Sequence, residues 1–138
     1  MSGASLSPFL ATLYVAIGGG VGAALRYHLG RVVVNITGPN ETFPWGTLGI
    51  NVIGSLAMGV LLGWLARSSM FAQTSETLRL VLAIGLLGGF TTFSAFSAEM
   101  VTLVQRGFLV QALGYGSASV IAGMTAFLIG LVGAQSAA

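Results

Sequence analysis

The sequence has no cysteine, aspartate or lysine, and only 6% of its 138 residues are charged. Without cysteine the chain can form no disulfide, iron–sulfur cluster, thiolate zinc site or cysteine nucleophile. A soluble domain carries about a quarter charged residues, so this composition excludes an ordinary hydrated surface. The net charge is only +2, and its dispersed arginines exclude a nucleic-acid partner, which requires clustered Lys and Arg.

Hydrophobic sequence is what the chain has in abundance, at 55% of residues and a mean hydropathy of +0.94. A helix needs about 20 mostly apolar residues to cross a bilayer. The uncharged segments long enough to do so are residues 1–25, 42–66, 80–98 and 107–138. The sequence therefore predicts an all-α membrane protein, a single domain over residues 1–138 surrounded by the lipid bilayer.

The expected transmembrane helices span roughly residues 8–34, 45–65, 78–104 and 108–132. Short connectors separate them: residues 35–44 contain Gly38, Pro39 and Pro44, and residues 67–77 have polar turn chemistry. No basic region precedes the first apolar stretch, so we expect no signal peptide.

Loop charge does not select one orientation. If the N-terminus is cytoplasmic, Arg67 and Arg79 lie inside while Arg31 and Arg106 lie outside, so the arginines that normally set topology are balanced. Such a chain can insert both ways up, and two copies then pair antiparallel about a twofold axis in the membrane plane. A single orientation, fixed by a small difference in loop charge or length, is an equally open alternative.

Glycine is abundant, with 21 residues, and several glycines lie four apart. The pairs are Gly18 with Gly22, Gly59 with Gly63, and Gly85 with Gly89. Small residues at this spacing let transmembrane helices approach closely, although many such pairs only pack the monomer. Because four helices alone enclose little interior, we expect a dimer or larger assembly.

The run GLLGGFTTFSAFSAE, residues 85–99, lies in the middle of the third apolar segment. Gly88 and Gly89 each lower helix propensity by about 1 kcal/mol, and the hydroxyls of Thr91 and Thr92 can bond to freed backbone groups. The run predicts a helix broken at mid-membrane, whose unwound carbonyls can bind an alkali cation. A plain kink at a packed glycine pair is the alternative.

Uncharged polar side chains form lines at helical spacing. Thr47, Asn51 and Ser55 follow one face of the second helix, and Tyr115 and Ser119 follow one face of the fourth. Such groups can replace part of an anion's hydration shell and still leave the ion free to move. Bonding between helices is the alternative for each of them.

Phe90, Phe93 and Phe96 recur every three residues, and their positive ring edges would attract a small anion weakly, although most such stripes only pack. Arg26 lies deep in the first helix or near its end. It can draw anions to a pore mouth, extend to the interface, or pair with Glu99.

The runs GGGVGAALRY, GTLGINVIGS and GGFTTFSAFSAEM closely resemble the Fluc (CrcB) family of bacterial fluoride channels. The resemblance covers all four helices, and the TTFSxFS signature is specific. It implies a dual-topology antiparallel homodimer in the inner (plasma) membrane. It also implies two pores near the subunit interfaces that export fluoride by passive electrodiffusion and relieve its toxicity, and a structural sodium ion at the dimer centre.

The same resemblance implies residue roles. Phe93 and Phe96 are similar to the phenylalanines that line the fluoride path, and Gly88 and Thr91 resemble positions whose main-chain oxygens hold sodium. The other implied pathway residues are polar side chains of the second and fourth helices and a vestibule arginine: Thr47, Asn51, Tyr115, Ser119 and Arg26. Gly123 departs from the pattern, because some members carry a further hydroxyl there.

Two other function classes compete with this reading. A small proton-coupled multidrug exporter is also a four-helix, dual-topology dimer, but it needs a carboxylate in its path, and the first helix here offers Arg26 and no acid. A non-transporting scaffold would use the glycines only for packing. An enzyme is not expected, because one His without Cys or Asp leaves no nucleophile and base together.

Overall fold

Helices long and apolar enough to cross a bilayer dominate the computed structural model, which describes residues 6–67 and 76–137. The spans are α1 (Pro8–Thr37), α2 (Trp45–Arg67), Glu76–Gln105 and α6 (Leu109–Ser136). The expectation of four transmembrane helices is confirmed. All four helices continue past their expected ends, and the third also begins before its expected start. Most of the polar connector predicted after Arg67 lies outside the described residues.

The third span is divided along its length. Its parts are η1, a π-helix (Arg79–Leu87), the short helix α4 (Gly88–Phe90) and α5 (Phe93–Gln105). Thr91 (φ −79°, ψ 159°) and Thr92 (φ −150°, ψ 117°) are extended between α4 and α5. The predicted break is therefore confirmed, whereas the sequence pattern does not predict the π-helix.

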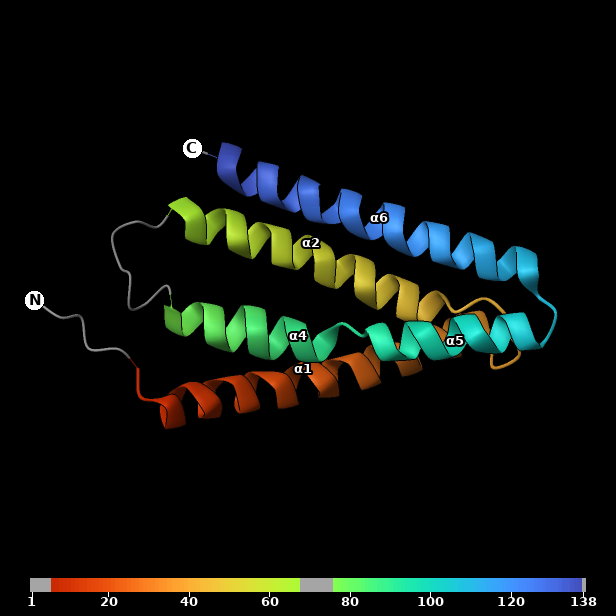
Figure 1. Cartoon of the computed structure of the whole chain (residues 1–138), viewed down its shortest axis with the longest axis horizontal. Helices are drawn as coiled ribbons and strands as arrows, with labels where there is room; N and C mark the ends of the chain where they lie inside the picture. Colours follow the sequence, from red (N-terminus) through yellow and green to blue (C-terminus); the bar gives the residue numbers. More distant parts are fainter. Residues whose placement is uncertain (1–5, 68–75, 138) are drawn as a thin grey trace, which may run out of the picture.

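The helices pack as two close pairs. Figure 1 shows α1 lying along η1 and α4, and α2 lying along α6, with α1 beginning and α6 ending at the same end of the molecule. A Cβ added at Gly18 would overlap the Val81 carbonyl oxygen of η1, and one added at Gly59 would overlap the Phe127 carbonyl oxygen of α6. The glycine faces thus act as predicted, by bringing backbones into contact.

The glycines before the break fulfil the packing role predicted from the Gly85–Gly89 spacing, but they are not the residues at which the helix unwinds. Gly88 is helical (φ −64°, ψ −38°), and a Cβ at Gly89 would overlap the backbone of Gly19 in α1. The unwound residues are the two threonines that follow. Gly89 therefore permits close packing of α4 on α1, while the break itself depends on bonds made by Thr91 and Thr92.

The helix ends are satisfied by local groups. Ser7 Oγ accepts a hydrogen bond from the Leu10 N–H at the start of α1, and Pro8 occupies the first turn, where no N–H is needed. Gly38 ends α1 with φ +97°, which side chains disfavour. Arg67 donates to the Ala134 and Ala137 carbonyls at the end of α6, where a cation also complements the helix dipole.

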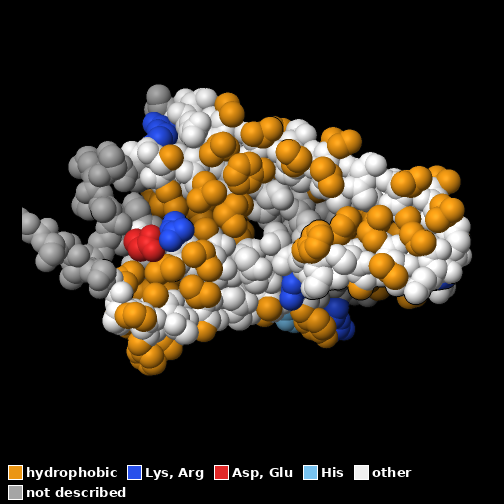
Figure 2. All heavy atoms as spheres, in the orientation of Figure 1, with side chains coloured by type: hydrophobic (Ala, Val, Ile, Leu, Met, Phe, Trp, Pro, Cys, Tyr) orange, Lys and Arg blue, Asp and Glu red, His pale blue; other side chains and the backbone are white. Residues whose placement is uncertain are grey.

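Apolar side chains face outward over most of the molecule. Figure 2 shows hydrophobic groups spread over the visible face with few charged ones among them. The small buried cluster lies near the α5–α6 connection and contains Leu103, Ala112 and Tyr115, with Phe96 and Met100 packed on it. An inside-out distribution of this kind suits a hydrocarbon surrounding. The chain is a multi-pass membrane protein.

The contact between α1 and η1 can be tested at two nearby glycines of α1. We expect Gly18→Ala to destabilise the protein by about 1–3 kcal/mol, because the added methyl forces two backbones apart. Gly20→Ala is the matched control, since nothing lies within 4 Å of a Cβ at that position. Thermal unfolding in detergent measures both variants. Equal melting temperatures for the two would contradict the close approach.

Candidate functional site

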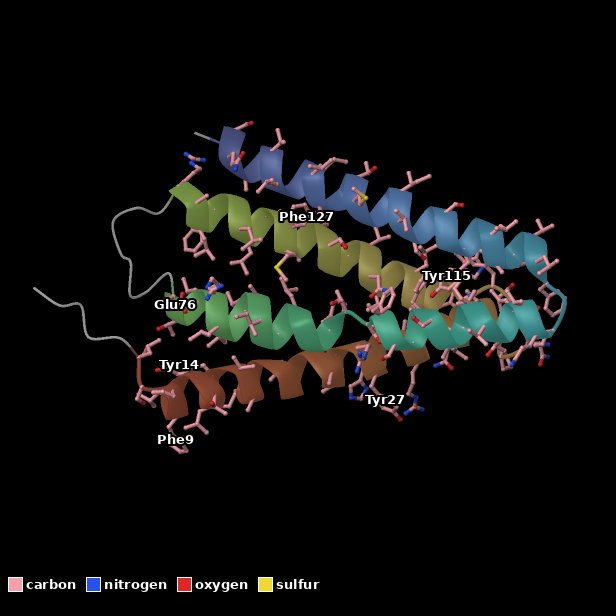
Figure 3. All side chains as sticks on the ribbon, in the orientation of Figure 1. Phe9, Tyr14, Tyr27, Glu76, Tyr115 and Phe127 are labelled. Atoms are coloured by element: carbon pink, nitrogen blue, oxygen red, sulfur yellow. The ribbon has the colours of Figure 1, made fainter. Side chains whose placement is uncertain are left out.

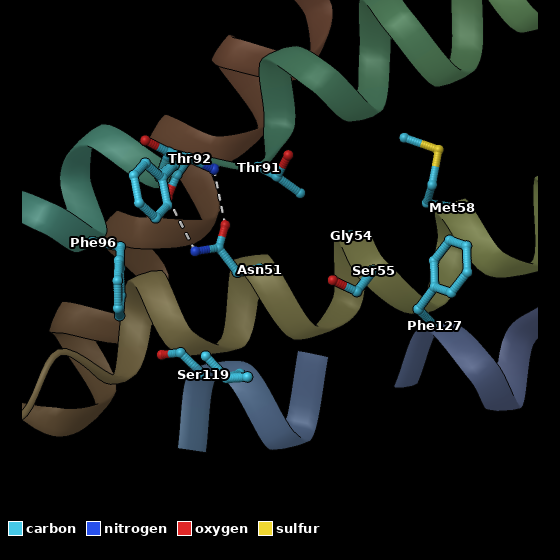
Figure 4. A pocket seen from close by; sticks show the side chains of 11 residues that line it. Asn51, Gly54, Ser55, Met58, Thr91, Thr92, Phe96, Ser119 and Phe127 are labelled. Atoms are coloured by element: carbon cyan, nitrogen blue, oxygen red, sulfur yellow. Dashed lines mark hydrogen bonds between the residues drawn. The ribbon is translucent and has the colours of Figure 1, made fainter. Parts of the chain in front are cut away.

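The break in the third span is held by one side chain of α2. The Thr92 N–H, which would bond to the Gly88 carbonyl in an unbroken helix, donates instead to Asn51 Oδ1 at 2.8 Å. Asn51 Nδ2 donates in turn to the Thr92 carbonyl at 3.1 Å, and Figure 4 shows both bonds. A single amide therefore satisfies both backbone groups of an extended residue inside an apolar span.

Two further groups complete the break. Thr92 Oγ1 accepts from the Ala95 N–H at 3.2 Å and so caps α5. Arg26 Nη1, from α1, donates to the Thr91 carbonyl at 3.3 Å. In the described part of the chain no ion pair joins Arg26 to Glu99, so the pairing left open by the sequence does not form. The guanidinium forms a hydrogen bond with a backbone carbonyl instead.

Glu99 joins α5 to α2 and α6. Thr47 Oγ1 donates to Glu99 Oε1 at 2.7 Å, and the Tyr115 hydroxyl donates to Glu99 Oε2 at 2.6 Å. Figure 3 shows Tyr115 on α6 and Tyr27 on α1. Bonding between helices, the alternative considered for Thr47 and Tyr115, is the arrangement in this structure. Sequence reasoning missed Glu99 as the centre of this network, although a lone carboxylate inside an apolar span was the signal.

A cavity of about 350 Å³, here called the break cavity, lies beside the two threonines. Figure 2 shows this face hollowed near its middle, and Figure 4 shows the cavity from close by. Its lining includes Asn51, Ser55, Thr91, Thr92, Phe93, Phe96, Ser119 and Phe127. Four of the predicted pathway residues, Asn51, Phe93, Phe96 and Ser119, thus come together. None of the described residues that line the break cavity is charged.

A second cavity, of about 380 Å³ and here called the mouth cavity, holds other predicted residues. Arg26, Thr47 and Glu99 line it, and Thr92 lines both this cavity and the break cavity. Tyr115 lines neither cavity and is fully buried. The structure therefore separates the predicted residues into a charged part and an uncharged part that meet at Thr92.

The three phenylalanines do not form one stripe, because the extended residues intervene. Phe90 is buried before the break, whereas Phe93 is 79% exposed after it. The ring centroids of Phe93 and Phe96 are 5.7 Å apart, and Phe96 lies 5.1 Å from Tyr115. Because the large Phe93 ring points outward at the rim of the cavity, it faces either lipid or another protein surface.

Comparison with known proteins identifies the family. The family model described as CrcB-like protein, Camphor Resistance (CrcB), matches residues 13–131. The chain belongs to the CrcB family. A relative from Novosphingobium aromaticivorans, named fluoride-specific ion channel FluC, is 60% identical over 121 residues, which cover 88% of this chain and 93% of the relative. Proteins of the same name from Mesorhizobium japonicum and Erythrobacter litoralis are 45% and 46% identical, over 90% and 93% of this chain and 95% and 94% of their own lengths.

The donor set at the break of this CrcB-family chain suits an alkali cation better than a transition metal. The described residues contain no cluster of three or more His, Cys, Asp or Glu. The Gly88 carbonyl loses its usual helical partner to Asn51, and unwound carbonyls are typical sodium ligands. The Thr91 carbonyl already accepts from Arg26, so a cation there would have to share that oxygen with a guanidinium.

The Asn51 bonds give a direct test of how this CrcB-family fold holds its break. We expect Asn51→Ala to lower the free energy of unfolding by about 1–3 kcal/mol, because the Thr92 N–H is left without an acceptor. Asn35→Ala, an exposed amide in α1, is the control. Thermal unfolding in detergent compares them, and an Asn51→Ala variant as stable as the control would show that the break does not depend on this amide.

Proposed function

We propose that the chain is a fluoride channel that exports fluoride passively. The observation that carries the proposal is the break cavity, where uncharged hydrogen-bond donors of Asn51 and Ser119 lie beside the rings of Phe93 and Phe96. The names of the relatives, fluoride-specific ion channel FluC, support the same activity. No chemical conversion is involved, so the protein is not an enzyme.

The chemistry of the cavity fits a small anion in transit. Conduction requires binding that is favourable enough for entry and weak enough for release. Amide and hydroxyl donors and positive ring edges supply attraction without a fixed charge in the lining, and no lining residue is an arginine that would trap the ion. Fluoride that enters a cell as its neutral acid would leave through this path by electrodiffusion.

The mouth cavity contributes the charges. Arg26 lines it and would raise the local anion concentration before the uncharged region. Glu99 lines it too, but both carboxylate oxygens accept hydroxyl hydrogen bonds from Thr47 and Tyr115. In this proposal Thr47 and Tyr115 position the carboxylate, and Thr47 also lines the mouth cavity. Direct contact of either side chain with fluoride stays a prediction.

We infer further that the active form is an antiparallel homodimer in the inner membrane. The balanced arginines and the outward Phe93, 79% exposed, support a second copy of the chain as the neighbour. A sodium ion at the dimer centre would use the Gly88 and Thr91 carbonyls. Each chain would contribute these two oxygens, so a twofold axis beside the break would bring four carbonyl ligands together.

Ion release from liposomes tests the channel. We expect rapid fluoride release with little chloride release from the wild type. We expect Phe96→Ile to slow fluoride release on the order of tenfold, because the free energy of one contact with an aromatic ring, about 1 kcal/mol, corresponds to roughly that change in rate. Phe9→Ile is the control, since Phe9 is exposed at the start of α1 and far from the cavity in sequence. Release is followed with an ion-selective electrode.

Two results would contradict this assignment. A folded wild type that releases no fluoride would exclude the channel and favour a scaffold. Normal release from both Phe96→Ile and Phe93→Ile would leave the channel but remove the rings from the ion path.

The absence of native cysteine makes dual topology measurable. In a Gln135→Cys variant, placed at the exposed end of α6, we expect a membrane-impermeant maleimide added outside intact cells to label about half of the protein, because balanced loop charges insert the chain both ways. Asn40→Cys, at the opposite end of the bundle, is expected to give the same fraction. Complete labelling of one variant with none of the other would establish a single orientation.

A further inference from the structure

A third cavity continues from the break cavity along α2 and α6. It has a volume of about 580 Å³ and is here called the α2–α6 cavity. Ser55, Ser119, Val120 and Phe127 line both this cavity and the break cavity. The two spaces are therefore adjacent, and the serines lie where one passes into the other. Figure 4 shows Ser55 on α2 and Ser119 on α6.

Among the described residues that line the α2–α6 cavity, the two serines carry the only hydroxyl groups, and the other side chains are apolar. Ser119 Oγ is buried and makes no hydrogen bond within the described residues. Buried hydroxyls are rarely left without a partner. Ser55 Oγ likewise forms no hydrogen bond with a described residue, and Ser55 lines both cavities. Both donors are thus available to an ion or water in the cavity.

Gly123 explains why the hydroxyl comes from α2. A Cβ added at Gly123 would lie 3.6 Å from Ser55 Oγ, at ordinary contact distance. Any side chain at position 123 would therefore project into the space next to the Ser55 hydroxyl. Glycine at this position leaves that space open and contributes no donor of its own. Ser55 is the group that supplies one there.

We propose that Ser55 and Ser119 form a fluoride-binding site at the junction of the break cavity and the α2–α6 cavity, with the Ser55 hydroxyl serving the place that Gly123 leaves open. The proposal rests on the fluoride-channel function proposed above and adds Ser55 to the path. Two hydroxyl donors from facing helices can replace water around a small anion without fixing it in place. The path thereby has hydrogen-bond donors in a region whose other lining side chains are apolar.

Moving the hydroxyl from one helix to the other tests the site. We expect Ser55→Ala to slow fluoride release from liposomes by about tenfold, since one hydrogen bond to an anion is lost. In the double variant Ser55→Ala with Gly123→Ser, the hydroxyl returns from α6, and we expect release to recover to within about threefold of wild type. Ser117→Ala is the control, because Ser117 is exposed on α6 and lines neither cavity.

Each outcome separates this site from the channel as a whole. Elution profile and melting temperature in detergent confirm that every variant is folded. Ser55→Ala that conducts like wild type would overturn the proposal. So would a double variant that is folded but stays as slow as Ser55→Ala, because the loss would then be structural. If the wild type itself released no fluoride, the channel function would fail first, a result that differs from a defect confined to Ser55→Ala.

Discussion

The pair of hydrogen bonds between Asn51 and the backbone of Thr92 is the interaction on which the rest of the site depends. An unpaired backbone group in hydrocarbon costs several kcal/mol, so a spanning helix can unwind only where other groups take its bonds. The Asn51 amide forms hydrogen bonds with both the N–H and the carbonyl of Thr92, and Arg26 donates a hydrogen bond to the Thr91 carbonyl. The position of the break follows from these partners. The position of the break in turn determines the outward direction of Phe93 and the place of the break cavity.

The close helix pairs make this position possible. Gly18 and Gly89 bring α1 and the first half of the third span into backbone contact, and Gly59 does the same for α2 and α6. Each pair is tight where its backbones touch, and the break cavity lies between the pairs, at the level where the third span unwinds. Packing glycines and polar break residues thus perform separate tasks. The first group sets where the helices lie, and the second uses the space that remains.

The sequence predicted the four spans, the small-residue faces and the break, because each is visible in composition or in spacing along one helix. It did not predict the π-helix η1 or the partner of Arg26. Those features depend on the rotation and depth of one helix against another. Phe90 and Phe93 show the limit clearly: the three-residue repeat places them together, but the extended threonines between them bury one ring and expose the other. Glu99 was visible as a lone carboxylate, yet its partners come from two other helices.

The ionisable groups inside the span are kept away from the uncharged part of the cavity system. Arg26 and Glu99 both line the mouth cavity, and each is matched by a different kind of neutral group: a carbonyl accepts from the guanidinium, and two hydroxyls donate to the carboxylate. A fixed positive charge in the break cavity would hold an anion too strongly, and a fixed negative charge would exclude it. Because neutral partners position both groups at the mouth, the break cavity presents only dipoles and ring edges, which attract an ion weakly enough to release it.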